Sequence, residues 1–204
     1  MTNKYMNILC SDLESAFLPE LWLEIAEGLG LESLKLTTRD IPDLNVLMQK
    51  RFDVLKENKI NLKRIQEIVK KSELLDGAGD FLKWAKTKMP VVILSDTFWE
   101  FVSPLLEKME YSTVLCNYLE IDKNGYISNF HIRQDSKKRT VRFFKDSGFN
   151  VIAIGDSYND IGMLSEANHG FLFNASQKIS QDFNQFPSIL NYDDLKTNLE
   201  KIIK

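Results

Sequence analysis

Short apolar runs that each lead into a polar residue recur along this chain, and they constrain its fold more than any other feature. The clearest are residues 7–11 before Asp12, residues 91–94 before Ser95 and residues 151–154 before Gly155 and Asp156. Weaker runs occupy residues 113–116 and 170–173. Unbroken, partly β-branched runs of this length are typical of strands buried on both faces, so they predict a parallel sheet.

Helical patterns lie between these runs, at residues 77–88, at 97–109 and after Ser136, which is the expected N-cap of its helix. Because strands and helices alternate, we expect right-handed crossovers and a doubly wound α/β fold. Residues 114–134 interrupt the alternation with an Asn-Gly pair between two strand-like runs, which predicts a hairpin.

A longer interruption, residues 18–76, has no strand pattern. Its amphipathic patterns predict three helices, at residues 19–29, 42–59 and 61–71. Pro19 suits the first turn of the first helix. We interpret residues 18–76 as a small helical cap domain inserted after the first strand. Residues 1–17 and 77–204 would then form the catalytic α/β core.

Composition excludes several functional classes. A formal net charge of −3 gives no electrostatic reason to expect nucleic acid or an anionic membrane as partner. Two histidines and two cysteines do not supply a recognisable zinc cluster, and we expect the cysteines to be reduced. The N-terminus lacks the apolar core of a signal peptide, and no run approaches the ~20 apolar residues of a membrane span. We therefore expect a soluble, cytoplasmic protein.

Acidic side chains follow three of the predicted strands, as Asp12, Asp96 and Asp156. Open parallel sheets bind ligands at the carboxyl ends of their strands, where these carboxylates would crowd together. Such crowding is relieved by a bound cation, and oxygen ligands favour Mg²⁺ over zinc or copper. The sequence therefore predicts a magnesium site.

An anion site is predicted beside it. Ser95 follows a strand and precedes the predicted helix at 97–109, so its hydroxyl and nearby N–H groups are placed to hold phosphoryl oxygens. Lys137, Lys138 and Arg139 occupy a first helical turn, where the helix dipole disfavours cations unless an anion is close. For Lys138 and Arg139 we prefer a solvated position.

Together these positions resemble the four motifs of the haloacid dehalogenase superfamily: Asp12-Leu13-Glu14, Ser95, Lys137 and Gly155-Asp156-Ser157-Tyr158-Asn159-Asp160. Finer features resemble one branch, the bifunctional phosphoserine phosphatase / phosphoserine:homoserine phosphotransferase family. They are residues 12–14, 18–22, 37–43, 93–98, 119–122, 155–160, 186–187 and 192–195.

The resemblance implies a role for each motif residue in Mg²⁺-dependent transfer of a phosphoryl group from phosphoserine to water or homoserine. Asp12 would be the nucleophile that becomes a phosphoaspartate, and Glu14 the general acid and base. Asp12, Asp156 and the backbone carbonyl of Glu14 would ligate Mg²⁺, with Asp160 orienting the site from behind.

Substrate contacts are implied in the same way. Ser95, Asp96 through its backbone, and Lys137 would bind phosphate, with Lys138 as the alternative lysine. Asn159 would reach the substrate, although a turn role suits it equally. Glu20 and Arg51 in the cap would bind the α-ammonium and α-carboxylate, because an arginine fork fits a carboxylate.

Two positions depart from the usual pattern of the superfamily, which has Asp at position 14 and often Gly at position 15. The bifunctional branch also has Glu at position 14, whereas Ser15 puts the local backbone geometry in question. Three alternatives stay open: a phosphatase for another small phosphomonoester, such as phosphoethanolamine or a sugar phosphate, a phosphoaspartate receiver, and a degenerate binding module. The cap argues against a receiver, and the filled motifs argue against a degenerate module. The physiological acceptor and the oligomeric state, including a homodimer, are left open.

Overall fold

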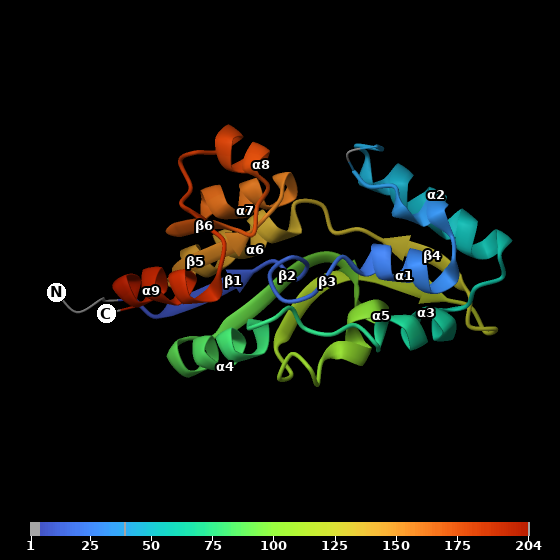
Figure 1. The fold of residues 1–204 in the computed structure, drawn as a ribbon, viewed down its shortest axis with the longest axis horizontal. Helices are drawn as coiled ribbons and strands as arrows, with labels where there is room; N and C mark the ends of the chain where they lie inside the picture. The colour runs from blue at the N-terminus through green and yellow to red at the C-terminus, as the bar shows by residue number, and fades with distance from the viewer. Residues whose placement is uncertain (1–4, 39, 204) are drawn as a thin grey trace.

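The computed structural model describes residues 5–38 and 40–203. Arg39, within the 37–43 stretch, lies outside them. The described residues form a sheet with the order β4-β3-β2-β1-β5-β6-β7 (Figure 1). Its strands are β1 Asn7–Ser11, β2 Val91–Phe98, β3 Thr113–Ile121, β4 Ile127–His131, β5 Asn150–Gly155, β6 His169–Phe173 and β7 Ser188–Ile189. The predicted α/β fold is confirmed.

Every neighbouring pair of strands is parallel except β3 and β4, which form an antiparallel hairpin. The predicted hairpin is therefore also confirmed. Because β1 lies between β2 and β5, the three strands that precede the candidate site residues are neighbours. From β1 the strands that follow in sequence are added on one side (β2, β3, β4) and then on the other (β5, β6, β7). The point where the order reverses, between β1 and β5, is a topological switch point, where α/β proteins bind ligands.

Alternate residues of the buried strands supply two separate cores, one on each face of the sheet, as a period of two requires. Helices α6 Ser136–Asp146, α7 Ile161–Glu166 and α8 Gln177–Asp182 cover one face, where Ile8, Cys10 and Val151 are buried. Helices α4 Ala78–Lys88 and α9 Tyr192–Ile202 cover the other. Figure 1 shows the first group above the sheet and α4 below it.

Between β1 and α4 the described residues form the helices α1 Leu21–Leu29, α2 Leu44–Glu57 and α3 Leu62–Val69, with a 3-10 turn at Glu32–Lys35. Figure 1 shows α1, α2 and α3 together with β4 at one end of the molecule. An aromatic cluster joins them to the core: Trp22, Phe52, Phe98, Phe101 and Phe130, with ring centroids 5.1–6.5 Å apart.

Three local expectations are wrong. No helix spans 97–109, because β2 continues to Phe98, which pairs with β3, and Pro104 interrupts the turns that follow. The short helix α5 Trp99–Val102 and a 3-10 turn at Ser103–Leu105 replace it. Ser136 is the first residue of α6, and Asp135 precedes it at the N-cap with φ 50°. Pro19 lies before α1, whose N-cap is Glu20.

Among the described residues, no helix combines the length and the apolar character needed to cross a membrane.

Replacing Phe81 by alanine should lower the free energy of unfolding by about 3–5 kcal/mol, because the buried ring would leave a cavity. Phe81 is fully buried in α4 and contacts the rings of Phe17, Trp84 and Tyr192. Urea unfolding measures the loss. Phe143→Ala is the control, since that ring is 64% exposed and should cost less than about 0.5 kcal/mol. Equal losses in the two variants would contradict the packing described here.

Candidate active site

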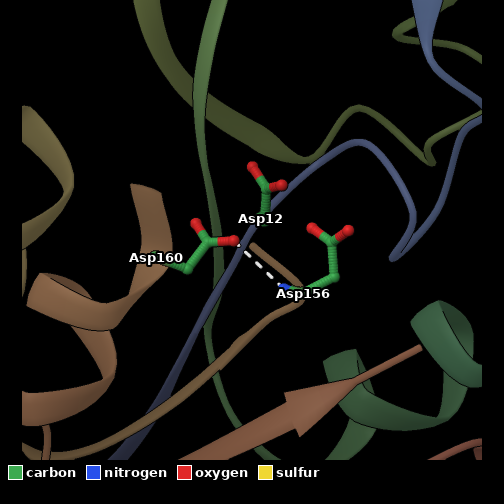
Figure 2. Close-up of side chains that lie close together, drawn as sticks. All are labelled: Asp12, Asp156 and Asp160. Carbon is green, nitrogen blue, oxygen red and sulfur yellow. Dashed lines mark hydrogen bonds between the residues drawn. The ribbon is translucent and has the colours of Figure 1, made fainter. Parts of the chain in front are cut away.

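The candidate site lies where β1, β2 and β5 end. Asp12 directly follows β1, Asp156 directly follows β5, and Ser95 and Asp96 belong to the last part of β2. The backbone N–H of Asp12 donates to the carbonyl of Ile154 at 2.9 Å, which ties the end of β1 to β5. Figure 2 shows the carboxyl groups of Asp12, Asp156 and Asp160 gathered at this edge.

Lys137 is the cation at the centre of these acids. Its Nζ lies 2.8 Å from Oδ1 of Asp12, 2.8 Å from Oδ1 of Asp160 and 3.7 Å from Oδ2 of Asp96. Burial alone lowers the pKa of Lys137, but the charges of Asp12 and Asp160 outweigh burial and raise it well above the usual range. Lys137 is therefore charged, and it is 6% exposed, whereas Lys138 points to solvent. Of the two lysines, Lys137 is the one at the site.

The acids outnumber the cation. Carboxylate oxygens of Asp12, Asp156 and Asp160 lie within 4.8 Å of one another. Burial, followed by the charge of Asp160, raises the pKa of Asp156 to about 6 and that of Asp12 well above its usual range. This excess of buried negative charge suits a hard divalent cation with oxygen ligands, so the residues fit a metal of the Mg²⁺ kind.

Asp160 holds the loop after β5 in shape. It is fully buried, and its Oδ2 accepts the N–H groups of Asp156 and Ser157 at 3.0 and 3.2 Å. Its other oxygen binds Lys137. A Cβ on Gly155 would lie 2.5 Å from the Cβ of Asp160, so only glycine fits there. The spacing from Gly155 to Asp160 thus follows from packing of the loop as much as from ligand chemistry.

Glu14 connects the turn after β1 to helix α1. Its Oε1 accepts the N–H of Leu21, the first residue of α1, at 2.8 Å, and so caps a helix whose own N-cap side chain makes no such bond. Burial, then the charge of Glu20, raises the pKa of Glu14 to about 8, and the Leu21 bond offsets only part of this rise. The surroundings of Glu14 therefore favour its protonated form.

Ser15, which stands where many relatives have glycine, has a backbone conformation that glycine favours. Its φ is 60°, the left-handed region that glycine adopts at little cost. Two bonds hold it there: its N–H donates to the carbonyl of Leu18 at 2.8 Å, and its own carbonyl accepts Nδ2 of Asn174 at 3.1 Å. The turn therefore accommodates a side chain.

The two substrate residues expected in the cap lie close to Glu14, since the charges of both Glu20 and Arg51 act on its pKa. Arg51 is 6% exposed, with its guanidinium 4.4 Å from the ring centroid of Trp22 and Nη2 donating to the Leu36 carbonyl at 2.6 Å. Its Nε is buried without a hydrogen-bond partner among the described residues. Glu20 is exposed.

A cavity of about 360 Å³ opens beside Lys137. Asp96, Lys137 and Asn159 line one part of it, and Thr38, Pro42 and Leu44, from the segment between β1 and β2, line another. Asn159 is exposed at its wall. The cavity gives a small molecule access to the lysine.

Asn117 is a buried polar residue that the sequence reasoning missed. It is 1% exposed, and its side chain contacts the backbone of Asp96 on one side and Arg133 on the other. The available signal was an amide side chain directly after the apolar run 113–116, within the predicted hairpin.

Comparison with known protein families identifies the family of this chain. Residues 18–168 match the haloacid dehalogenase-like hydrolase model, which places the chain among hydrolases. The chain belongs to the haloacid dehalogenase-like hydrolase family.

Two curated relatives are similar over most of the chain. Phosphoserine phosphatase ThrH of Pseudomonas aeruginosa is 45% identical over 96% of each chain. Phosphoserine phosphatase of Pseudomonas syringae pv. tomato is 42% identical over 96% of this chain and 83% of its own. A substrate-bound phosphoserine phosphatase structure aligns with a TM-score of 0.75 at 20% identity, covering 98% of this chain and 99% of that one, and shares the fold.

Without a divalent cation, these two groups should make the protein lose stability as the pH rises from about 4 to about 8. The folded-state pKa values of Asp156, about 6, and Glu14, about 8, exceed their ordinary values of 3.8 and 4.5. The folded protein therefore keeps protons that the unfolded chain releases, so the contribution to stability is present at low pH and lost as the pH passes these values. Melting temperatures in EDTA measure the trend.

Excess Mg²⁺ should raise the melting temperature more at the upper pH than at the lower, because the cation binds deprotonated carboxylates. Asp156→Asn is the matched variant, which should show a weaker pH trend in EDTA and a smaller gain from Mg²⁺. A gain from Mg²⁺ that is unchanged in this variant would contradict the assignment of Asp156 to the cation site.

Proposed function

We propose that this protein is a Mg²⁺-dependent phosphoserine phosphatase that also transfers the phosphoryl group to homoserine, through a phosphoaspartate on Asp12. One observation carries the proposal: Asp12 is ion-paired with Lys137, whereas Glu14, on the same turn, accepts a backbone N–H, that of Leu21. Two carboxyl groups in such different surroundings suit a nucleophile and a general acid. The names of the two curated relatives support phosphoserine as the substrate.

The reaction follows from these positions. A carboxylate oxygen of Asp12 attacks phosphorus, the bond from phosphorus to the serine oxygen breaks, and Glu14 gives its proton to the departing alkoxide. Water or an acceptor hydroxyl then transfers its proton to Glu14 and attacks the same phosphorus, which releases Asp12. Lys137 and Ser95 hold the phosphoryl oxygens during both steps.

Asp12, Asp156 and the backbone carbonyl of Glu14 would hold Mg²⁺, with Asp160 fixing the loop behind them. When bound, the cation neutralises charge on the phosphoryl oxygens. It also favours the ionised form of Asp12, whose pKa burial and Asp160 otherwise raise. The raised pKa of the nucleophile is thus itself a reason to expect a required cation.

Arg51 and Glu20 support an amino acid as the group that carries the phosphate. The guanidinium of Arg51 lies over the ring of Trp22, and one of its buried N–H groups has no hydrogen-bond partner in the described part of the chain, which an α-carboxylate would satisfy. The charge of Glu20 suits the α-ammonium. Both belong to the cap of residues 18–76, so in this proposal the cap selects the substrate while the core performs the chemistry. The substrates are cytoplasmic small molecules, and a homodimer is compatible with this scheme.

Homoserine should divert phosphate away from water. Its hydroxyl arm is one methylene longer than that of serine, a difference that a pocket discriminates by only ~1–3 kcal/mol. With labelled phosphoserine and Mg²⁺, ³¹P NMR should detect free phosphate alone, and phosphohomoserine once millimolar homoserine is added. Asp12→Asn should abolish both products, since an amide cannot act as the nucleophile. Free phosphate as sole product at saturating homoserine would leave a hydrolase without transferase activity.

Arg51→Ala should reduce kcat/KM for phosphoserine by the equivalent of about 2–5 kcal/mol, as expected when one partner of a buried charge pair is removed. Activity on phosphoethanolamine, which lacks the carboxylate, should barely change. Arg139→Ala is the control, because that arginine is exposed on α6. Equal losses on both substrates would mean that Arg51 only supports the cap, and would favour a phosphatase for another phosphomonoester.

A further inference from the structure

The last part of β2 does not pair regularly with β3. Leu94 pairs with Leu115, and the next pair is Phe98 with Asn117. Three residues of β2, Ser95 to Thr97, therefore lie opposite the single residue Cys116. Such a bulge bends the strand and removes backbone groups from the ladder. It falls on the residues proposed to bind phosphate.

Side chains replace the lost ladder bonds. The hydroxyl oxygen of Ser95 accepts the N–H of Thr97 at 3.1 Å. The carbonyl of Asp96 accepts Nδ2 of Asn117 at 2.8 Å. Since Asn117 is 1% exposed, water does not compete for this bond. The conformation of the bulge thus depends on one amide from the neighbouring strand.

The same amide has a second partner. Oδ1 of Asn117 accepts the backbone N–H of Arg133 at 2.8 Å. Arg133 precedes α6 by three residues, and Lys137 is the second residue of that helix. One side chain therefore links the bulge that carries Ser95 and Asp96 to the segment that delivers Lys137. These two arms meet again at the site, where Lys137 and Asp96 lie 3.7 Å apart.

We infer that Asn117 is a positioning residue, whose amide sets Ser95 and Lys137 at the separation that a phosphoryl group on Asp12 requires. This inference rests on the proposed function for the identity of the ligand. Asn117 itself acts through the Asp96 carbonyl and the Arg133 N–H. Misplacement by about 1 Å of a group that orients the reacting atoms costs on the order of 100-fold in rate.

Two variants test the inference. Asn117→Leu keeps the volume and removes both bonds, and Asn117→Asp keeps the acceptor for Arg133 but has no donor for Asp96. In both, kcat for phosphoserine should fall by about 100-fold. In both, the rise in melting temperature that Mg²⁺ with beryllium fluoride produces in the wild type should be largely lost. Beryllium fluoride mimics a phosphoryl group on Asp12, so this second measurement needs no substrate.

Asn168→Leu is the matched control. Oδ1 of Asn168 accepts the N–H of Val151 at 2.8 Å, at the opposite end of β5 from Asp156. Its loss should lower the melting temperature while leaving kcat and the beryllium fluoride shift unchanged. A merely structural role for Asn117 would give the same pattern, and that outcome overturns the inference. If Asn117→Leu does not fold, Asn117→Asp decides alone.

The two proposals fail in different ways. A wild type that is inactive on phosphoserine but stabilised by beryllium fluoride removes the proposed substrate, and loss of that stabilisation in the Asn117 variants still supports the inference. Full stabilisation of both variants overturns the inference even if phosphoserine is hydrolysed. A wild type that Mg²⁺ and beryllium fluoride do not stabilise overturns both the phosphoaspartate and the role of Asn117.

Discussion

The buried ammonium of Lys137 is the interaction on which this site depends. It holds Asp12, at the end of β1, and Asp160, in the loop after β5, at 2.8 Å each, and so joins two segments 148 residues apart in the chain. Carboxylates buried in this way are unstable without a partner, and a lysine buried without them would lose its proton. The ammonium and the two carboxylates therefore stabilise one another in their charged forms. The same ion pairs anchor the first turn of α6, the helix that carries Lys137.

Helices α1 and α2 contact the rest of the chain in a different way. Glu14, in the turn after β1, accepts the N–H of Leu21 at the start of α1. A second contact is apolar: the aromatic cluster that includes Phe52 and Phe98 joins α2 to β2. The polar contact is directional and lies at the chemistry, whereas the apolar contact tolerates adjustment.

Much of this was predictable from the sequence, for identifiable reasons. Buried parallel strands are unbroken apolar runs, so the strands ending at Asp12 and Asp156 and their shared edge followed from pattern alone. The end of β2 did not, because Ser95 to Thr97 form a bulge, and a bulge is stabilised by a partner strand whose register the sequence does not reveal. Two further contacts were hidden for the same reason, because they join residues that are not neighbours in sequence. They are the hydrogen bonds of Asn117 and the bond from the N–H of Leu21 to Glu14.

The close approach of Gly155 to Asp160 has a consequence for how this sequence can change. Any side chain at position 155 would push on the Asp160 carboxylate that holds Lys137, and Lys137 in turn binds Asp12, so the substitution would disturb Asp12 as well. A smaller residue at position 160 would make room for that side chain, but it would also free the lysine. A substitution at either position therefore disturbs the site, and a second substitution at the other position does not compensate for it. Steric exclusion therefore constrains position 155, and the charge of Lys137 constrains position 160.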